Sequence, residues 1–178
     1  MYEGVLTFWF EELGPKKWWL SDPELDARIR QSYLGLLRQA AQGELYAWRS
    51  SPYGRLAEII VLDQFSRNIY RDRAEAYSQD AIALVLAQEA VATRAHEALS
   101  ATERVFLLIP YMHSESRLIH VQGEALFRAF TPRDNYEFEL RHKVIIDRFG
   151  RYPHRNEVTG RLSTREELEF LQQPGSRF

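Results

Sequence analysis

Helix-start signals recur along the whole sequence, and each precedes a segment whose apolar residues return every three or four positions. The stretches Ser100–Glu103 and Ser163–Glu166 have the Ser/Thr-x-x-Glu form, in which the two side chains cap the first backbone N–H groups reciprocally. The tetrapeptide Ser-Asp-Pro-Glu at residues 21–24 adds a proline near the first helical position. No Asn-Gly or Asp-Gly hairpin turn and no long alternation of apolar and polar residues occurs. The sequence therefore predicts an all-α fold.

The expected helices lie near residues 2–13, 22–42, 52–70, 78–98, 101–129, 133–149 and 163–172. The segments between them are short, and none has the composition of a flexible linker, so residues 1–178 are expected to form a single all-α domain. Short connections favour antiparallel neighbours. We therefore expect a compact helical-hairpin stack or superhelix of about seven helices, although no convincing 34-residue repeat is present.

Charge and composition exclude several classes of function. The net charge is −2 and no basic stripe is present, which argues against nucleic acid or an anionic membrane as a partner. The chain has no cysteine, which removes disulfides and thiol chemistry. The N-terminus lacks the basic region of a signal peptide, and no apolar run reaches the ~18 residues of a membrane span. A cytoplasmic location is the expectation.

Two charges interrupt the apolar pattern of the helix expected at 52–70. Leu56 and Ile60 define one stripe, and its continuation falls on Asp63 and Arg67, four residues apart, while the opposite side is also apolar. Charges on such a helix are buried and need partners. One interpretation is an internal Asp–Arg clamp. The other makes Arg67 and Arg71, one turn apart, an anion-binding edge that Asp63 orients.

A second polar group follows Pro110, which is expected to kink the helix at 101–129. His113 and Glu115 come directly after it, and His113 is either an acid–base group or a hydrogen-bonded structural residue. On an unbroken helix Arg117 and His120 would share the face of His113. Two histidines seven residues apart are too distant along a helix to bind one metal ion, so neither a metal nor another cofactor is expected.

The third polar group spans residues 135–156. His142 lies on an apolar helical stripe, where a hydrogen-bonded core histidine is the usual occupant. Gly150 then ends the helix in the manner of a C-cap. The loop after it holds Arg151, His154, Arg155 and Asn156. Such a loop either binds the ends of helices through its side chains or presents donors to an anion.

The motifs "LDQFSRNIYR", "PYMHSE" and "FGRYPHRN", together with "FWFEELGPKKWW" and "GRLSTREELEFL" near the two ends, resemble the bacterial family named domain of unknown function 924. The resemblance covers essentially the whole chain and implies a compact all-α protein of tetratricopeptide-like type. It implies no activity. The family pattern maps onto Asp63, Gln64, Phe65, Arg67, Asn68, Arg71, Pro110, His113, Ser114, Glu115, His142, Gly150, Arg151, Pro153, His154, Arg155 and Asn156. Ser116 stands where an acidic residue is expected.

Two hypotheses of different classes follow. The first is a pocket for a small carboxylate or phosphate ligand, with His113 and His154 as candidate acid–base groups. Its binding residues would be Asp63, Arg67, Asn68, Arg71, Glu115, His142, Arg151 and Arg155. The alternative is a non-catalytic helical scaffold for a peptide or protein partner. It predicts an exposed aromatic groove at Trp9, Trp18 or Trp19 and internal pairing of the motif charges. No Gly-rich phosphate loop, Gly-x-Ser-x-Gly or Rossmann motif decides whether the protein is an enzyme.

Overall fold

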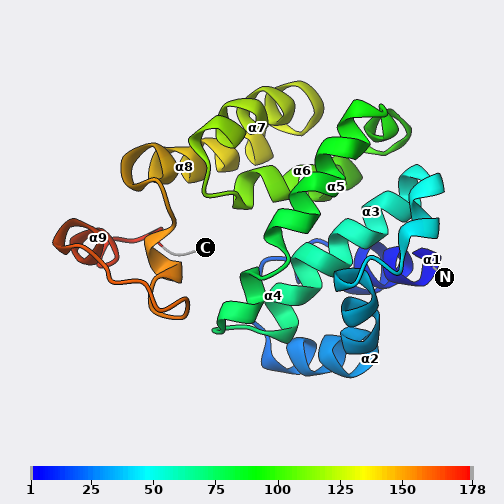
Figure 1. Ribbon diagram of the computed structural model, residues 1–178. Helices are drawn as coiled ribbons and strands as arrows, with labels where there is room; N and C mark the ends of the chain where they lie inside the picture. The colour runs from blue at the N-terminus through cyan, green and yellow to red at the C-terminus, as the bar shows by residue number, and fades with distance from the viewer. Residues whose placement is uncertain (1, 177–178) are drawn as a thin grey trace.

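The computed structural model describes residues 2–176, which form helices joined by turns, with no strand among them (Figure 1). The all-α fold class is confirmed. The α-helices are α1 (Tyr2–Leu6), α2 (Pro23–Ala41), α3 (Pro52–Ile60), α4 (Ser66–Ile69), α5 (Asp80–Ala92), α6 (Ala101–His113), α7 (Arg117–Phe130), α8 (Arg133–Phe149) and α9 (Arg165–Phe170). Shorter 3-10 helices are η2 (Tyr46–Ser50), η4 (Ala74–Tyr77), η5 (Ala95–Ala98) and η6 (Pro153–Arg155). None of the helices between residues 2 and 176 is long and apolar enough to cross a membrane.

Two segments are π-helical, and one of them carries the first polar motif. The segment η1 (Thr7–Leu13) continues α1, and η3 (Val61–Phe65) joins α3 to α4, so that residues 52–69 run as one helix, as predicted. A π turn adds a residue to the helical turn and is often found at functional sites. Asp63 lies in this turn.

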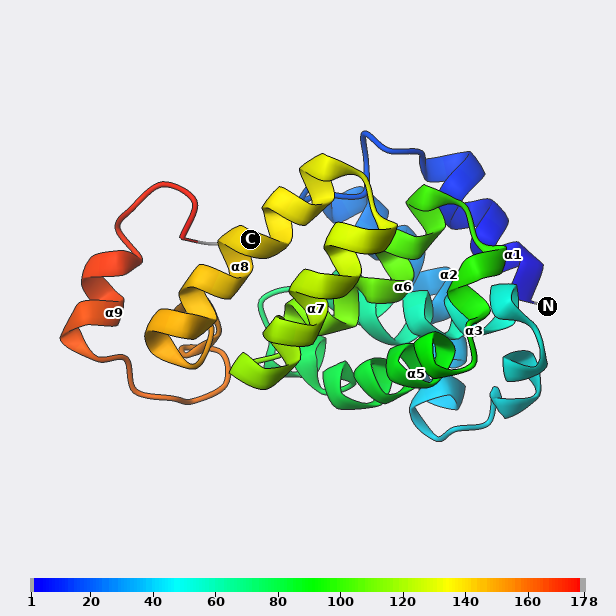
Figure 2. The ribbon, with the colours of Figure 1, turned by 90° about the horizontal axis from the view of Figure 1, so that it is seen from above.

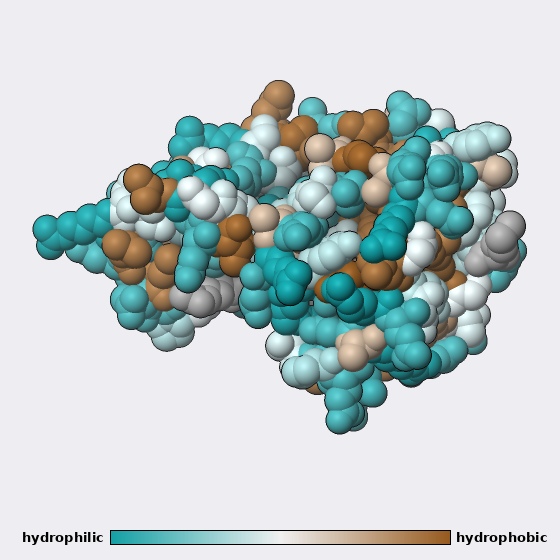
Figure 3. Space-filling model, turned by 60° about the horizontal axis from the view of Figure 1, so that its bottom comes forward, coloured by the Kyte–Doolittle hydropathy of each residue, from teal (hydrophilic) through white to brown (hydrophobic). Residues whose placement is uncertain are grey.

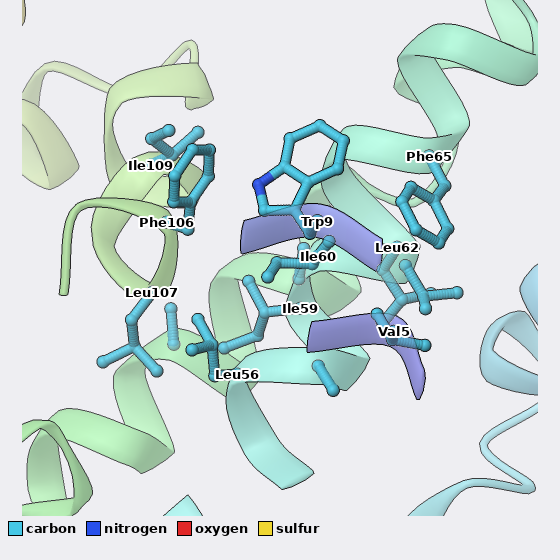
Figure 4. Packing of buried hydrophobic residues seen from close by; sticks show 14 of the residues in the cluster. Val5, Trp9, Leu56, Ile59, Ile60, Leu62, Phe65, Phe106, Leu107 and Ile109 are labelled. Carbon is cyan, nitrogen blue, oxygen red and sulfur yellow. The ribbon is translucent and has the colours of Figure 1, made fainter. Parts of the chain in front are cut away.

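The main core gathers the apolar faces of α1, α3, α5 and α6. Trp9 is 1% exposed and lies between Phe106 of α6 and Phe65 at the end of η3, with ring centroids 5.5 and 5.7 Å away (Figure 4). Leu56 and Ile59 of α3 are fully buried beside them. Burial of these large side chains is the main stabilising contribution to this part of the molecule.

The single helix predicted for residues 101–129 is wrong. Pro110 lies inside α6, which continues to His113, and the chain leaves helical geometry at residues 114–116, where Ser114 and Ser116 are extended. The reason is tertiary: the Glu115 carboxylate accepts the backbone N–H of Tyr152 at 2.7 Å and the guanidinium of Arg161. His113 and the residues of α7 therefore do not share one helical face.

The capping boxes are partly as predicted. Ser100 and Glu103 cap each other at the start of α6. At α9 the box is Thr164 and Glu167, one residue later than predicted, because Ser163 accepts a hydrogen bond from Asn156 at 3.0 Å.

Residues 150–176, here called the C-terminal arm, follow α8. Gly150 ends α8 with φ of 69°. Figures 1 and 2 show α9 standing apart from the helices of the main core, and Figure 3 shows the arm as a narrower lobe beside the main body. Its own apolar cluster is small and centres on Tyr152, with Ile145 and Ile146 of α8. This arrangement leaves a cleft between the arm and the body.

Candidate functional site

A cleft of about 1170 Å³ lies where α4, α6 and α8 meet the C-terminal arm. Ligand clefts usually measure about 300–1,000 Å³, so this one is roomy. Its apolar wall includes Trp18, Trp19, Val105, Ile109, Met112, Phe138, Ile145 and Phe170. Its polar wall includes Arg67, Asn68, Arg71, His113, His142, His154 and Arg155. Residues of all three polar motifs therefore line one cleft.

A smaller cavity of about 350 Å³ adjoins the cleft. Tyr77, His113 and Arg155 line both cavities and so form the wall between them. Asp80 and Glu115 line only the smaller one. The shared wall therefore brings together side chains from η4, α6 and η6.

Asp63 supports this wall through its contact with His113. It is 1% exposed, and its carboxylate contacts Nδ1 of His113 at 2.8 Å, Nη1 of Arg67 at 3.1 Å and Nε2 of Gln64 at 2.6 Å. Burial by itself raises the pKa of Asp63, but Arg67 and His113 together lower it more, so the net pKa lies well below the usual range. The ion pair predicted between Asp63 and Arg67 is present.

A second carboxylate, Asp80, continues the chain of charges. Arg67 donates to its Oδ2 at 3.1 Å, and Arg155 donates to the same atom at 3.1 Å. Asp80 was not among the predicted site residues. Its only signal in the sequence is a position in the first turn of a helix. An aspartate is common there because its charge interacts favourably with the positive end of the helix dipole.

Arg155 is the least satisfied charge of the group. It is 6% exposed, and its guanidinium lies between the rings of Tyr77 and Tyr152, 4.5 and 4.6 Å from their centroids. Its Nε–H has no acceptor among residues 2–176. Burial lowers the pKa of Arg155, and Asp80 opposes that effect. A buried guanidinium with one carboxylate and spare donors is suited to an added acceptor.

His113 is half-enclosed in the same wall. Its Nδ1 contacts Asp63, and its Nε2 has no hydrogen-bond partner among the described residues. Burial, with help from Arg67, lowers the pKa of His113, although Asp63 acts in the opposite direction. The ring is therefore neutral at pH 7.

The other two histidines of the cleft lie on α8 and in the arm. His142 is 3% exposed and donates from Nδ1 to the carbonyl of Phe138 at 2.9 Å, and burial lowers its pKa to about 3. His154 lines the cleft with its ring 5.6 Å from that of Tyr152. His120, in contrast, is fully buried between Glu139 and the carbonyl of Ser114 and joins α7 to α8.

Several predicted binding residues are engaged elsewhere. Arg71 makes a two-pronged ion pair with Asp26 at 2.5 and 2.8 Å, and Asn68 donates to the same carboxylate at 2.8 Å. Arg151 lies outside both cavities and pairs with Glu167 at 2.6 and 2.8 Å. Glu115 accepts hydrogen bonds from two residues of the arm, Tyr152 and Arg161. Arg151 therefore stabilises the arm internally, and Glu115 attaches the arm to the body.

The aromatic groove expected for a scaffold is only partly formed. Trp9 is buried in the core, which contradicts its expected exposure. Trp18 donates from its indole N–H to the carbonyl of Trp9 at 2.8 Å, and Trp19 is 55% exposed at the rim of the cleft. Between residues 2 and 176, no group of three or more His, Cys, Asp or Glu side chains is arranged to hold a metal ion.

The comparisons with known proteins agree on the fold. A family model described as "Bacterial protein of unknown function (DUF924)" matches residues 5–175. The structure is similar to that of a protein of unknown function from Agrobacterium tumefaciens, with a TM-score of 0.91 and 31% sequence identity over 96% of each chain. No curated protein matches the sequence.

Proposed function

The chain belongs to the DUF924 family of bacterial proteins of unknown function, and we propose from the site itself that it binds an amphipathic organic anion in the large cleft. The observation that carries the proposal is the buried guanidinium of Arg155. Asp80 accepts from its Nη1, while its Nε–H and Nη2 donate to no described residue. A carboxylate or phosphate oxygen is a strong acceptor for such a planar donor group.

The remaining wall of the cleft supports an apolar body for this ligand. Trp18 of the N-terminal loop, Ile109 of α6 and Phe138 of α8 line this apolar part of the cleft. A ligand that covers these side chains removes apolar surface from water. A ligand with an anionic head near Arg155 and an aliphatic or aromatic body would match the polar and the apolar walls of the cleft.

Positive charge remains at Arg155 on the shared wall. Four of the ionised residues that line the cleft are arginines and two are aspartates: Arg67, Arg71, Arg141, Arg155, Asp72 and Asp134. Arg67 is paired with Asp63 and Asp80, and Arg71 is paired with Asp26, so these two guanidiniums are already neutralised. Arg155 has to share Asp80 with Arg67, and its charge is therefore only partly matched.

Binding of decanoate, measured through the fluorescence of Trp18 and Trp19, tests the proposal. Decanoate is expected to change the emission in a saturable manner, and decylamine, with the same chain and a positive head, is expected to bind more weakly. The variant Arg155→Gln should weaken decanoate binding roughly 10- to 100-fold, because it removes charged hydrogen bonds. Arg67 still pairs with Asp80 in this variant.

The matched control is Arg128→Gln, which removes an exposed guanidinium of α7 that lines neither cavity and should leave decanoate binding unchanged. Circular dichroism checks that each variant remains folded. Equal binding of decanoate and decylamine to the wild-type protein would contradict the proposal even if Arg155→Gln fails to fold.

A second candidate function is supported by the rim of the cleft. Trp19 and Leu20 are 55% and 57% exposed and both line the cleft, so an apolar peptide could cover them while its C-terminal carboxylate binds Arg155. This peptide-binding scaffold predicts that an apolar pentapeptide with a free C-terminus binds and its C-terminal amide does not. Under this alternative decanoate competes only weakly with the peptide.

A further inference from the structure

The tautomer of His113 follows from its hydrogen bond to Asp63. Asp63 is ionised, because Arg67 pairs with it inside the protein. An ionised carboxylate only accepts hydrogen bonds. Nδ1 of His113 therefore carries a proton and donates it to the Asp63 carboxylate, with 2.8 Å between the nitrogen and the oxygen. Nε2 then carries the lone pair, and it belongs to a side chain that lines both cavities.

We propose that Nε2 of His113 is the general base of a hydrolytic reaction on an acyl ester held in the large cleft, with Asp63 as its positioning residue. The inference rests on the proposed function for the binding of the anionic group of the substrate at Arg155. An imidazole oriented by a buried carboxylate is a recurrent arrangement for proton transfer in enzymes.

The nucleophile in this reaction is water. The nearest hydroxyl in the sequence, that of Ser114, accepts the backbone N–H of Ser116 at 3.2 Å, and no hydroxyl among the described residues hydrogen-bonds Nε2. The smaller cavity brings polar side chains, among them Ser78 and Thr159, to the other side of the wall. A substrate in the cleft and water from the smaller cavity can therefore meet at His113.

The proposed step is balanced in atoms and charge. Nε2 takes a proton from water while the water oxygen forms a bond to the carbonyl carbon, and the carbonyl electron pair moves to its oxygen. The resulting oxyanion lies in the field of the guanidinium of Arg67, which contacts Asp63 beside His113. Its collapse breaks the carbon–oxygen bond to the leaving group, which takes the proton back from His113. The products are a carboxylic acid and an alcohol.

The environment of His113 sets the pH range of this base. The titratable and charged groups around it are Asp63, Arg67, Tyr77, Asp80, Glu115, His142, His154 and Arg155. Burial and Arg67 lower the pKa of His113 from its usual value of 6.5, and Asp63 and Asp80 oppose them. The base form is thus present at neutral pH and is lost only when the pH falls below this pKa.

The test uses the mono-4-nitrophenyl ester of octanedioic acid, which combines a carboxylate, an apolar chain and an activated ester. The wild-type protein is expected to release 4-nitrophenol, and His113→Gln should lower kcat about 100-fold or more, the usual contribution of general-base catalysis. His113→Gln should still bind decanoate. The control His96→Gln removes a histidine that lines neither cavity and should retain the activity.

Two further measurements separate catalysis from a structural role of these residues. The rate should rise with pH to a plateau, with a midpoint below 6.5, and should be lower in D2O because a proton moves in the rate-limiting step. Asp63→Asn should shift that midpoint to lower pH, because it removes the carboxylate that raises the pKa of His113. A wild-type rate equal to that of His113→Gln, or a pH-independent rate, would overturn the proposal.

The neutral ester 4-nitrophenyl octanoate distinguishes this proposal from the binding proposal. Decanoate binding without any His113-dependent hydrolysis would reject the base and keep the anion pocket. Hydrolysis of the neutral ester that depends on His113 but not on Arg155, without decanoate binding, would reject the anion pocket and keep the base. Faster hydrolysis of the acidic ester than of the neutral one, abolished by Arg155→Gln, supports both.

Discussion

The body of the molecule, formed by α1 to α6, and the C-terminal arm are held together by different interactions. In the body, Trp9, Phe65 and Phe106 pack ring against ring inside a large apolar core (Figure 4). In the arm, Glu167 accepts from Arg151, from Asn156 and from the backbone of Thr164, and the apolar cluster is small. The body therefore depends on non-directional burial, and the arm on directional charged hydrogen bonds.

This difference bears on the site, because the site has parts from both regions. His113, Asp63 and Asp80 belong to the body, and Arg155 belongs to the arm. Since regions with few apolar contacts open more easily than a core, the arm is expected to open locally while the body stays folded. Docking of the arm is thus what brings Arg155 to Asp80 and completes the wall shared by the two cavities.

The largest expected effect is in the body. Phe65 is fully buried, and its ring lies 4.6 Å from that of Tyr33 and 5.7 Å from that of Trp9. Phe65→Ala should lower the free energy of unfolding by about 3–5 kcal/mol in urea denaturation, through lost burial and a cavity. Tyr46→Ala, at a site 70% exposed, should change it by less than about 0.5 kcal/mol. A small loss of unfolding free energy in Phe65→Ala would show that the body is less tightly packed than the ring contacts of Phe65 indicate.

An intermediate effect is expected in the arm, and it depends on pH. Arg151 lowers the pKa of Glu167 from 4.5 to about 2 in the folded arm, because its guanidinium donates two hydrogen bonds to the carboxylate. The ionised Glu167 therefore stabilises the folded arm fully above about pH 4.5. This contribution is lost as the pH falls towards 2 and the carboxylate is protonated. Glu167→Gln should therefore destabilise the arm by about 2 kcal/mol at pH 7 and have little effect near pH 2.

Hydrogen exchange of residues 150–176, compared between variant and wild type at each pH, measures this effect. The control is the neighbouring Glu166→Gln, whose carboxylate is 60% exposed and pairs with Arg148 on the surface. Faster exchange in the body as well as in the arm of Glu167→Gln would mean that the two regions unfold together.

Much of the body was predictable from the sequence, because its signals are local. The cap of α6 at Ser100 and Glu103 and the burial of Leu56 and Ile60 follow from spacing along one helix. The pairing of Asp63 with Arg67 could be predicted for the same reason, since the two residues are one turn apart.

The arm and the rest of the site were less predictable, because they depend on contacts between distant segments. Asp80 acquires its role only when the fold brings Arg67 and Arg155 to it across 13 and 75 positions of the chain. The break before α7 depends on Glu115 reaching Tyr152, 37 positions away. Helical periodicity contains no information on such pairs, so Arg151 was assigned to the ligand although it pairs with Glu167.

The smallest expected effect lies at Gly150, where α8 ends and the arm begins. Gly150 has a φ of 69°, and a Cβ there would meet Arg117 no closer than 3.7 Å, so the cost of Gly150→Ala comes from the backbone and is about 1 kcal/mol. Gly4→Ala, inside α1 with no contact within 4 Å, is the control and should not destabilise the protein. Gly150→Ala should speed hydrogen exchange in the arm alone and weaken decanoate binding, since Arg155 leaves Asp80 whenever the arm opens. Unchanged binding in a variant with a loosened arm would show that the anion does not depend on Arg155.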